Sequence, residues 1–264
     1  MDLQLKGKKA FVSGSTQGIG FAIAQQLLQE GAEVIINGRT TARVTEAVEK
    51  LKQLVPGANI SGVAADFAKA AEVQQLLTQI NEVDILINNA GIFEPKPFAD
   101  VTDEEWLRFF EINVLSGVRL SRYFFPKMLA KNWGRIIFIS SESAIQIPEE
   151  MIHYGTTKTA QLSISRGLAE LTKGTNVTVN TVMPGPTKSE GVEEFIKKLA
   201  TAGNITPQEA EDDFFKTMRP TSLIQRFADV AEIANLVTYV ASPLSAATNG
   251  AALRADGGLV KTIF

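Results

Sequence analysis

The chain has 264 residues, 45% of them hydrophobic, so it can bury a substantial core as one large domain or two small ones. Its formal net charge of −3 provides no basic surface for nucleic acid or for an anionic membrane. With no cysteine and a single histidine, the sequence excludes disulfides, thiol nucleophiles and multi-histidine metal sites, so we expect no metal centre.

Short β-branched or aliphatic runs alternate with longer amphipathic stretches, as is typical of strand–helix units around a buried parallel sheet. The predicted strands are residues 9–13, 33–37, 59–64, 83–88, 135–140, 177–182 and 251–254. The predicted helices are residues 18–30, 41–54, 72–79, 103–125, 154–171 and 229–240. With no linker or repeat between them, residues 1–264 are expected to form a single α/β domain, doubly wound in three layers around a mainly parallel seven-stranded sheet.

The amino terminus lacks a secretory hydrophobic region, and no apolar run approaches the roughly 20 residues of a membrane span. The chain is therefore expected to be cytoplasmic, either an enzyme or a binding protein.

A glycine-rich turn joins the first predicted strand directly to the first helix. It consists of Gly14, Ser15, Thr16, Gln17, Gly18, Ile19 and Gly20. Glycine permits a tight turn and lets backbone amides approach an anion, while the helix amino terminus adds partial positive charge. The spacing differs from the usual dinucleotide fingerprint, and the Lys-Ser/Thr ending of a phosphate loop is absent, which argues against an NTPase. The turn therefore predicts a nucleotide pyrophosphate site.

The end of the second strand indicates which nucleotide is bound. NAD-binding proteins usually place an acidic residue there to accept from the ribose 2′-hydroxyl, whereas an arginine accommodates a 2′-phosphate. This chain has no acid at that point and carries Arg39, with Asn37 and Thr40 beside it. NADP(H) is therefore predicted in preference to NAD(H).

Tyr154 and Lys158 lie four residues apart in a predicted helix, so their side chains are neighbours. An isolated phenol titrates near pH 10, and an adjacent cation lowers that pKa, so the pair could exchange a proton during catalysis. The same spacing also occurs on ordinary solvated helix faces. The spacing alone therefore does not decide between a catalytic pair and two residues on a solvated helix face.

Residues 188–220 are charged and helical in pattern, although a short connection would suffice between the strands on either side. The segment is either a substrate lid or a passive surface insertion. Its apolar residues have the spacing of one helix face. They are Phe195, Leu199, Phe214, Phe215 and Met218.

Taken together, these features resemble the short-chain dehydrogenase/reductase family, in its single-domain Rossmann-type branch, across essentially the whole chain. The residues that carry the resemblance are Gly14, Gly18, Gly20, Asn88, Asn89, Ala90, Gly91, Asn113, Ser141, Tyr154, Lys158, Pro184 and Gly185. The resemblance implies an oxidoreductase that transfers a hydride between NADP(H) and a carbonyl or secondary alcohol.

The resemblance also implies a catalytic role for four residues. Tyr154 would be the general acid in reduction and the general base in oxidation. Ser141, thirteen positions before it, would orient the substrate oxygen, although chemistry alone does not exclude the adjacent Ser140. Lys158 would lower the pKa of Tyr154 and bind ribose hydroxyls. Asn113 would hold a water that connects Lys158 to solvent.

Further positions are implied for the cofactor. Asp66 would accept from the adenine amino group beside the backbone amide of Phe67. The positions around the adenine ribose and the nicotinamide would be Asn89, Ala90, Gly91, Pro184, Gly185 and Thr187. Each also has an ordinary structural alternative, such as a helix cap or a turn at the end of a strand.

The loop at residues 142–153 would line the substrate pocket, and the resemblance implies that residues 188–220 fold over the substrate as a hydrophobic lid. Its apolar candidates are Ile145, Ile147, Met151 and Ile152. Gln146 could meet a polar group, and His153 is favoured for a structural or rim role. A moderately bulky carbonyl or alcohol substrate is expected.

The resemblance also implies an oligomeric state and a set of candidate substrates. Related proteins pack the equivalents of helices 103–125 and 154–171 across a two-fold axis, so a homotetramer or homodimer is expected. The first of these helices carries Trp106, Phe109, Phe110, Tyr123, Phe124 and Phe125, more than one sheet face requires. Reduction is the favoured direction, with a 3-oxoacyl thioester, a sugar or a steroid among the candidate substrates. A non-catalytic NADP(H)-responsive binding protein is the alternative of a different class.

Overall fold

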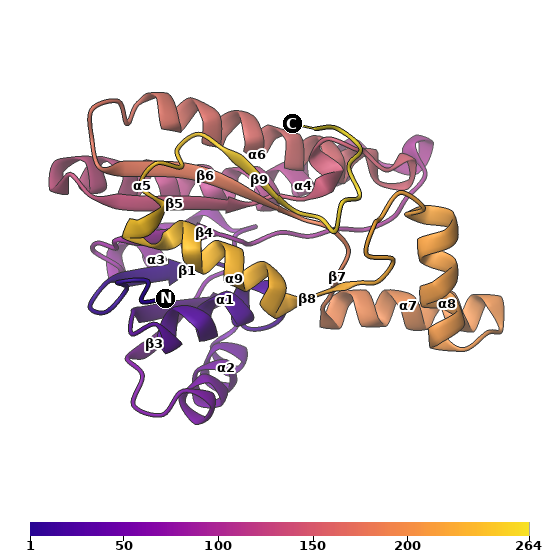
Figure 1. Ribbon diagram of the computed structural model, residues 1–264, viewed down its shortest axis with the longest axis horizontal. Helices are drawn as coiled ribbons and strands as arrows, with labels where there is room; N and C mark the ends of the chain where they lie inside the picture. Colours follow the sequence, from indigo (N-terminus) through magenta and orange to yellow (C-terminus); the bar gives the residue numbers. More distant parts are fainter. Residues whose placement is uncertain (264) are drawn as a thin grey trace.

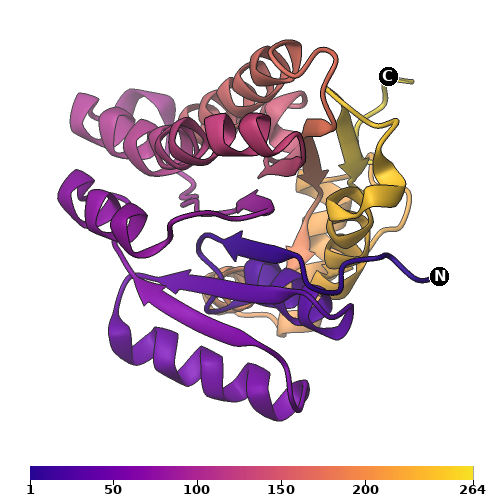
Figure 2. The same ribbon diagram turned by 90° about the vertical axis from the view of Figure 1, so that its left-hand side faces the viewer.

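The computed structural model describes residues 1–263, which contain a central seven-stranded sheet of the order β3-β2-β1-β4-β5-β6-β9 (Figures 1 and 2). Every neighbouring pair in this sheet is parallel. The strands are β1 (Lys9–Val12), β2 (Glu33–Gly38), β3 (Ile60–Ala64), β4 (Ile85–Asn88), β5 (Gly134–Ile139), β6 (Val177–Pro184) and β9 (Ala252–Ala255). The strand order reverses between β1 and β4, and ligands of open α/β sheets bind at the carboxyl ends beside such a point.

Helices cover both faces of the sheet, which confirms the three-layer, doubly wound prediction. One face packs against α1 (Gly18–Gln29), α2 (Thr41–Leu54) and α9 (Val230–Ala241). The other packs against α3 (Ala70–Gln79), α5 (Ser116–Lys131) and α6 (Ile152–Glu170). Alternate strand residues divide between the two apolar clusters: Val12 belongs to the first and Phe11 to the second.

The predicted helix 103–125 is one continuous path with a break in its hydrogen bonding. It begins as α4 (Asp103–Phe110) with the capping box of Thr102 and Glu105, passes through a π-helical turn at Glu111–Leu115, and continues as α5. The helix does not end before Pro126 but runs to Lys131. Burial of neighbouring side chains against the sheet compensates for the proline, which costs an isolated helix about 3 kcal/mol.

The aromatic side chains of this path are partly used within the chain. Phe109, Phe124 and Phe125 are buried, the last two in the cluster under the sheet. Trp106 and Phe110 are only half-buried. The aromatic surplus that led us to expect assembly is therefore smaller than the sequence indicated.

The segment predicted as a lid or a surface insertion is a folded unit that projects from one end of the molecule (Figure 1). It contains α7 (Glu190–Gly203), α8 (Pro207–Asp213) and a π-helical turn at Phe214–Met218. Its own apolar cluster includes Ile196, Ala200, Ala210, Phe214, Phe215 and Phe227. A parallel pair of short strands, β7 (Thr187–Lys188) and β8 (Ala228–Asp229), closes its base.

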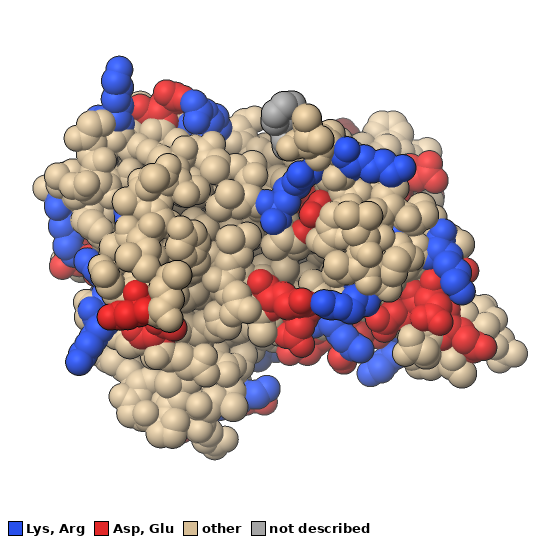
Figure 3. Space-filling model, in the orientation of Figure 1, with Lys and Arg blue, Asp and Glu red and all other residues tan. Residues whose placement is uncertain are grey.

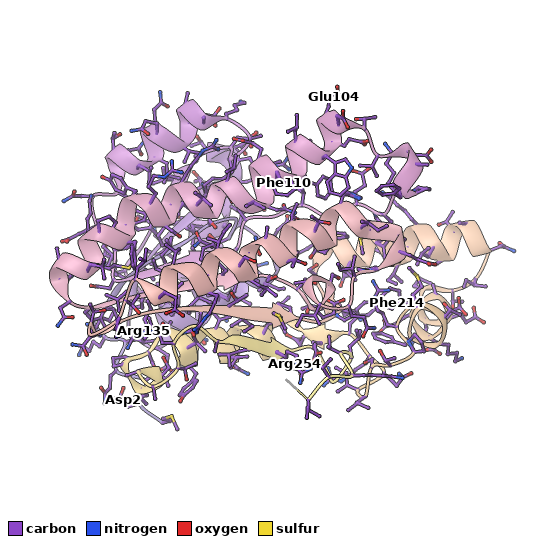
Figure 4. The ribbon with its side chains drawn as sticks, turned by 90° about the horizontal axis from the view of Figure 1, so that it is seen from above. Asp2, Glu104, Phe110, Arg135, Phe214 and Arg254 are labelled. Atoms are coloured by element: carbon purple, nitrogen blue, oxygen red, sulfur yellow. The ribbon has the colours of Figure 1, made fainter. Side chains whose placement is uncertain are left out.

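The insertion lies at the carboxyl-terminal end of the sheet. In the view from above, Phe214 and Arg135, which stands at the start of β5, lie toward opposite ends of the molecule (Figure 4). Carboxylates gather on and beside the projecting unit, four of them from α8 (Figure 3). None of the helices within residues 1–263 is long and apolar enough to cross a membrane.

Candidate active site

The glycine turn is shaped by close approach to the segment after β4. Gly14 has φ +60°, and a Cβ atom there would lie 3.0 Å from the Cα atom of Ala90. A Cβ atom on Gly20 would lie 2.5 Å from the side-chain nitrogen of Asn89. Gln17, the N-cap of α1, forms no side-chain cap within the described residues, so the first amides of the helix face the cleft without one. This turn has the properties of a pyrophosphate site.

Asn89 and Ser13 fasten the turn to the end of β4. The Asn89 amide group donates to the main-chain oxygens of Ser13 and Gly14 at 3.0 and 2.8 Å. The Ser13 hydroxyl accepts from the backbone amides of Asn89 and Ala90 at 2.9 and 3.0 Å. These four contacts hold the glycine turn against the segment that follows β4.

Ser15 and Asn37 support the turn from below. The fully buried Ser15 hydroxyl donates to the Val12 carbonyl at 2.6 Å, and the Ser15 amide donates to the Asn37 carbonyl at 2.8 Å. The side-chain oxygen of Asn37 accepts from the Gly14 amide at 3.1 Å. Ser15, a predicted cofactor residue, therefore has its donors committed to the fold.

A cleft runs along the carboxyl ends of β1, β2 and β4. Predicted cofactor residues that line it are Gly14, Thr16, Gln17, Gly18, Ile19, Gly20, Arg39, Asp66, Phe67, Asn89, Ala90 and Gly91. Lining residues that the sequence reasoning missed include Arg43, Arg108, Ile112, Ser189, Glu190 and Gly191. Within residues 1–263, no cluster of three or more histidine or acidic side chains could hold a metal ion.

Two exposed arginines stand where the cleft meets the end of β2. Arg39 directly follows the strand, and Arg43 lies in the first turn of α2, whose N-cap Thr40 accepts from the Arg43 amide at 3.4 Å. Asp66 faces the same cleft, and one of its carboxylate oxygens accepts from the Ala68 amide at 3.0 Å. The arginine pair gives this end of the cleft a local positive charge.

A second cavity adjoins the cleft, with Ile19, Phe93 and Ser189 lining both. It contains Ser141 and Tyr154, together with the predicted nicotinamide residues Pro184, Gly185 and Thr187. Ser141 is placed by the end of β5, and Tyr154 by the first turn of α6. The structure thus brings these predicted residues to one place, beside the opening of the glycine turn.

The pKa of Tyr154 is raised above its ordinary value. Burial is the main cause, and the nearby Glu142 carboxylate adds to it, while hydrogen bonding with Ser141 and the charge of Arg219 act in the opposite direction. The protein environment therefore raises the pKa of Tyr154, whereas Lys158 was expected to lower it. A phenol with this pKa is protonated throughout the neutral range.

Lys158 is 5% exposed, and its ammonium group points into the protein. The Nζ atom donates to the Ile139 carbonyl at 2.9 Å and lies 3.5 Å from the side-chain oxygen of Gln161. It stands 5.7 Å from the ring centroid of Tyr154. Burial lowers the pKa of Lys158 to about 8, although Glu142 opposes this shift.

Gln161 connects Lys158 to Asn113, and the sequence reasoning missed it. The Gln161 side-chain nitrogen donates to the Asn113 carbonyl at 2.5 Å, while its oxygen faces Lys158. Asn113 lies in the π-helical turn, and its own side chain bonds both main-chain groups of Ile92, at 2.8 and 3.0 Å, and the Thr157 hydroxyl. Gln161 therefore links the Lys158 ammonium group to the main chain of Asn113.

Replacing Gln161 with leucine is expected to lower kcat and to shift its pH profile. The Lys158 ammonium would lose an acceptor, so its pKa should fall below about 8, and the alkaline limb of the profile should move to lower pH. Ser165→Ala is the matched control on the same helix, because the Ser165 hydroxyl has no partner among the described residues. An unshifted limb in Gln161→Leu would show that the bridge has no part in the proton chemistry.

The loop at residues 142–153 differs from its predicted arrangement. Met151 lines the second cavity, whereas Ile145 and Ile147 are exposed to solvent. His153 is buried, with its ring 4.3 Å from that of Phe109 and 6.1 Å from that of Trp106. His153 is therefore packed between α4 and α6, in keeping with the structural role favoured for it.

Charged side chains form one wall of the second cavity. Glu142 and Arg219 are 5% and 8% exposed, and the Arg219 Nε atom lies 3.8 Å from a Glu142 carboxylate oxygen. Both terminal nitrogens of Arg219 donate to one oxygen of Glu150 at 3.2 Å. The sequence reasoning had assigned no role to these three residues.

The other walls are apolar and come largely from the insertion. Phe195, Phe214 and Met218 line the cavity. Phe215 packs inside the insertion, where its ring lies 5.0 Å from that of Phe227. The predicted apolar set therefore divides between the cavity wall and the core of the insertion.

The structure joins the glycine-turn cleft to a cavity lined by Ser141 and Tyr154, with Lys158 buried beside Tyr154. On a doubly wound sheet, this is the arrangement of a nucleotide-dependent oxidoreductase of the Rossmann type. A family profile described as short chain dehydrogenase matches residues 8–200. The chain belongs to this family.

Individual relatives extend the match over the whole chain. The uncharacterized oxidoreductase YvaG of Bacillus subtilis (strain 168) is 54% identical over 264 residues, with all of both chains covered. A D-beta-hydroxybutyrate dehydrogenase of Cupriavidus necator is 30% identical over 97% of this chain and 99% of its own. The crystal structure of L-sorbose reductase from Gluconobacter frateurii, complexed with NADPH and L-sorbose, superposes with a TM-score of 0.92 at 31% identity and covers all of both chains.

Proposed function

We propose that the protein is an NADP(H)-dependent oxidoreductase that interconverts a carbonyl compound and a secondary alcohol. The observation that carries the proposal is the placement of Tyr154 and Ser141 in a cavity that adjoins the glycine-turn cleft. A dinucleotide laid along the cleft would bring its reactive ring to this junction. The similar L-sorbose reductase, whose structure contains NADPH, supports the same arrangement.

The cleft has the form that such a cofactor requires. The turn has no room for a Cβ atom at Gly20, and the first amides of α1 have no side-chain cap, so they could donate to a pyrophosphate. Thr187, whose hydroxyl donates to the Gly185 carbonyl at 2.8 Å, lines the cavity beside Tyr154 and would contact the nicotinamide. When bound, the nicotinamide would exchange a hydride with the substrate carbon.

Tyr154 would give its proton to the substrate oxygen during reduction. Its raised pKa keeps the phenol protonated before the reaction, and the buried Lys158 ammonium would stabilise the phenolate left behind. Ser141 would hold the substrate oxygen in place. Gln161 would hold Lys158 in contact with Asn113.

Arg39 is expected to select NADPH over NADH. Replacing Arg39 with alanine should raise the KM for NADPH by about 10- to 100-fold, the value of one charge-assisted contact to phosphate, and leave the KM for NADH nearly unchanged. Initial rates with each cofactor measure the effect. Arg43→Ala, one turn into α2, tests whether the second arginine shares the contact.

The two cofactors are controls for one another in this experiment. A loss of the same size with NADH would show that Arg39 supports the fold or the adenine and does not recognise a 2′-phosphate. A wild-type preference for NADH would contradict the proposed cofactor directly.

The proposed function is tested by oxidation of NADPH and NADH against ketones, 3-oxoacyl thioesters and sugar-derived carbonyls. Turnover of any carbonyl class with NADPH supports it. Tight NADPH binding without turnover across the whole panel would instead indicate a non-catalytic binding protein. Saturation of the reduction rate with only one class of substrate would distinguish a 3-oxoacyl thioester reductase from a sugar or steroid reductase.

Assembly into a homodimer or homotetramer remains part of the proposal. Leu107 on α4 and Leu171 at the end of α6 are 70% and 64% exposed, and both lie on helices for which the family resemblance implies a part in assembly. The half-buried Trp106 and Phe110 lie on the same helix as Leu107.

A further inference from the structure

The hydroxyl proton of Ser141 is already in use. The Ser141 hydroxyl donates to one carboxylate oxygen of Glu142, and its oxygen accepts from the Ser143 amide at 3.1 Å. A serine hydroxyl carries a single proton. Ser141 can therefore donate to a substrate carbonyl only after it has released Glu142.

Glu142 depends on the donors around it. Burial raises the pKa of this carboxyl group, and the hydroxyls of Ser141 and Ser143 and the charge of Arg219 oppose that rise. The Ser143 hydroxyl lies 3.2 Å from Glu142, and Arg219 divides its charge between Glu142 and Glu150. Removing a hydrogen-bond donor from a buried carboxylate, without replacing it, costs more free energy than removing a donor from a buried neutral group.

A substrate can supply the missing donor if it carries a hydroxyl group beside its carbonyl. Ser141 and Glu142 line the same cavity and are in hydrogen-bond contact, so a hydroxyl on the carbon next to the carbonyl would reach Glu142 while Ser141 turns to the carbonyl oxygen. Ser141 and Glu142 then each keep a hydrogen-bond partner. A plain ketone would leave Glu142 one donor short.

On the basis of the proposed function, we propose that the substrate is an uncharged α-hydroxy ketone and that Glu142 recognises its hydroxyl group. The wall also disfavours anionic substrates, because two carboxylates share one guanidinium in the buried cavity. L-sorbose, which is bound in the similar reductase from Gluconobacter frateurii, carries a hydroxyl group next to its carbonyl.

The test compares isosteric substrate pairs: hydroxyacetone with butan-2-one, and 3-hydroxybutan-2-one with 3-methylbutan-2-one. The wild-type enzyme should prefer the hydroxylated member by about 100-fold or more in kcat/KM, because a site built for a hydroxyl rejects the analogue that lacks it. Acetoacetate, as the anionic comparison, should be a poor substrate.

Glu142→Leu should reverse this pattern. Without the carboxylate, the Ser141 hydroxyl is free, so kcat/KM for the plain ketones should rise while that for the hydroxy ketones falls. The ratio should drop below about 10. Loss of a merely structural contact would lower both members together. Glu142→Gln, which keeps the shape but loses the charge, provides an intermediate ratio if the leucine variant does not fold.

Glu149→Gln is the charge-matched control, since Glu149 is exposed on the same loop and should leave the ratio unchanged. A ratio near one in the wild type, or a ratio unaffected by either Glu142 variant, would overturn the proposal and leave the proposed function intact. Turnover of 3-oxoacyl thioesters alone would likewise overturn the α-hydroxy ketone proposal and leave the proposed function intact. Absence of turnover with every carbonyl, despite NADPH binding, would instead refute the proposed function.

Discussion

Replacing Tyr154 with phenylalanine is expected to lower kcat for carbonyl reduction by about 100- to 10,000-fold, the usual contribution of a positioned general acid. The ring would keep its edge contact with Phe93, whose centroid lies 6.4 Å away, so the cavity should keep its shape. Single-turnover reduction in the presence of saturating NADPH measures the chemical step. The Kd for NADPH, measured by fluorescence, should change little.

Tyr123→Phe is the matched control, because Tyr123 lies on α5 and its ring packs beside Phe124, away from both cavities. It should keep wild-type turnover. Wild-type turnover in Tyr154→Phe, under conditions where chemistry limits the rate, would show that another group supplies the proton.

Replacing Lys158 with methionine is expected to abolish turnover and, at pH 7, to stabilise the fold. Burial lowers the pKa of Lys158 from 10.5 to about 8, which corresponds to about 3 kcal/mol of stability lost by the charged form. Loss of the hydrogen bond to the Ile139 carbonyl would offset about 1 kcal/mol of the gain. The net gain should raise Tm by about 4 to 8 °C.

The sign of this effect depends on pH. Below pH 8 both the folded and unfolded states carry the charged lysine, so the full cost is present. Between pH 8 and 10.5 the unfolded state binds the additional proton, so wild-type stability rises with pH and the advantage of the variant should disappear. Calorimetry without added cofactor at pH 7 and pH 10 measures both values.

Lys131→Met provides the comparison with an exposed lysine, since a hydrogen bond with Asp84 raises the pKa of Lys131. That variant should show no gain at pH 7. A difference between wild type and Lys158→Met that stays constant with pH would contradict the buried-charge explanation.

The sequence predicted the parts of the site that depend on local spacing. The glycine turn follows a strand and opens a helix, and Tyr154 and Lys158 share one helix, so both patterns are visible within a few residues. Their meeting in space follows from the parallel sheet, because the carboxyl ends of its strands lie along one edge.

The charged wall could not be predicted in the same way. Glu142 and Arg219 belong to separate segments whose distance in the fold is set by the insertion, and no local pattern relates them. Hydrophobicity also failed to predict which side chains of the loop at residues 142–153 face the cavity, since Ile145 and Ile147 are apolar yet exposed to solvent. The hydrophobicity of a side chain does not show whether an irregular backbone directs it toward the core or toward solvent.

The π-helical turn shows a further limit. A helix with regular periodicity was predicted through residue 113, and the widened turn places the Asn113 carbonyl where Gln161 can reach it from α6. The contact joins residues 48 positions apart in sequence. Helical periodicity predicts that a helix exists but does not show where one residue is added to a turn.

The short ladder between Thr187 and Ala228 has a consequence for how the chain can vary. Because β7 and β8 pair in parallel, the intervening helices leave and return at almost the same point, and the entropic cost of closing such a loop rises only slowly with its length. Residues can be added to or removed from this excursion without changing the register of the seven main strands. The insertion that lines the cavity can therefore change in sequence and length independently of the sheet and the glycine turn. Its only strand pairing with the rest of the described chain is at β7 and β8, which have two residues each.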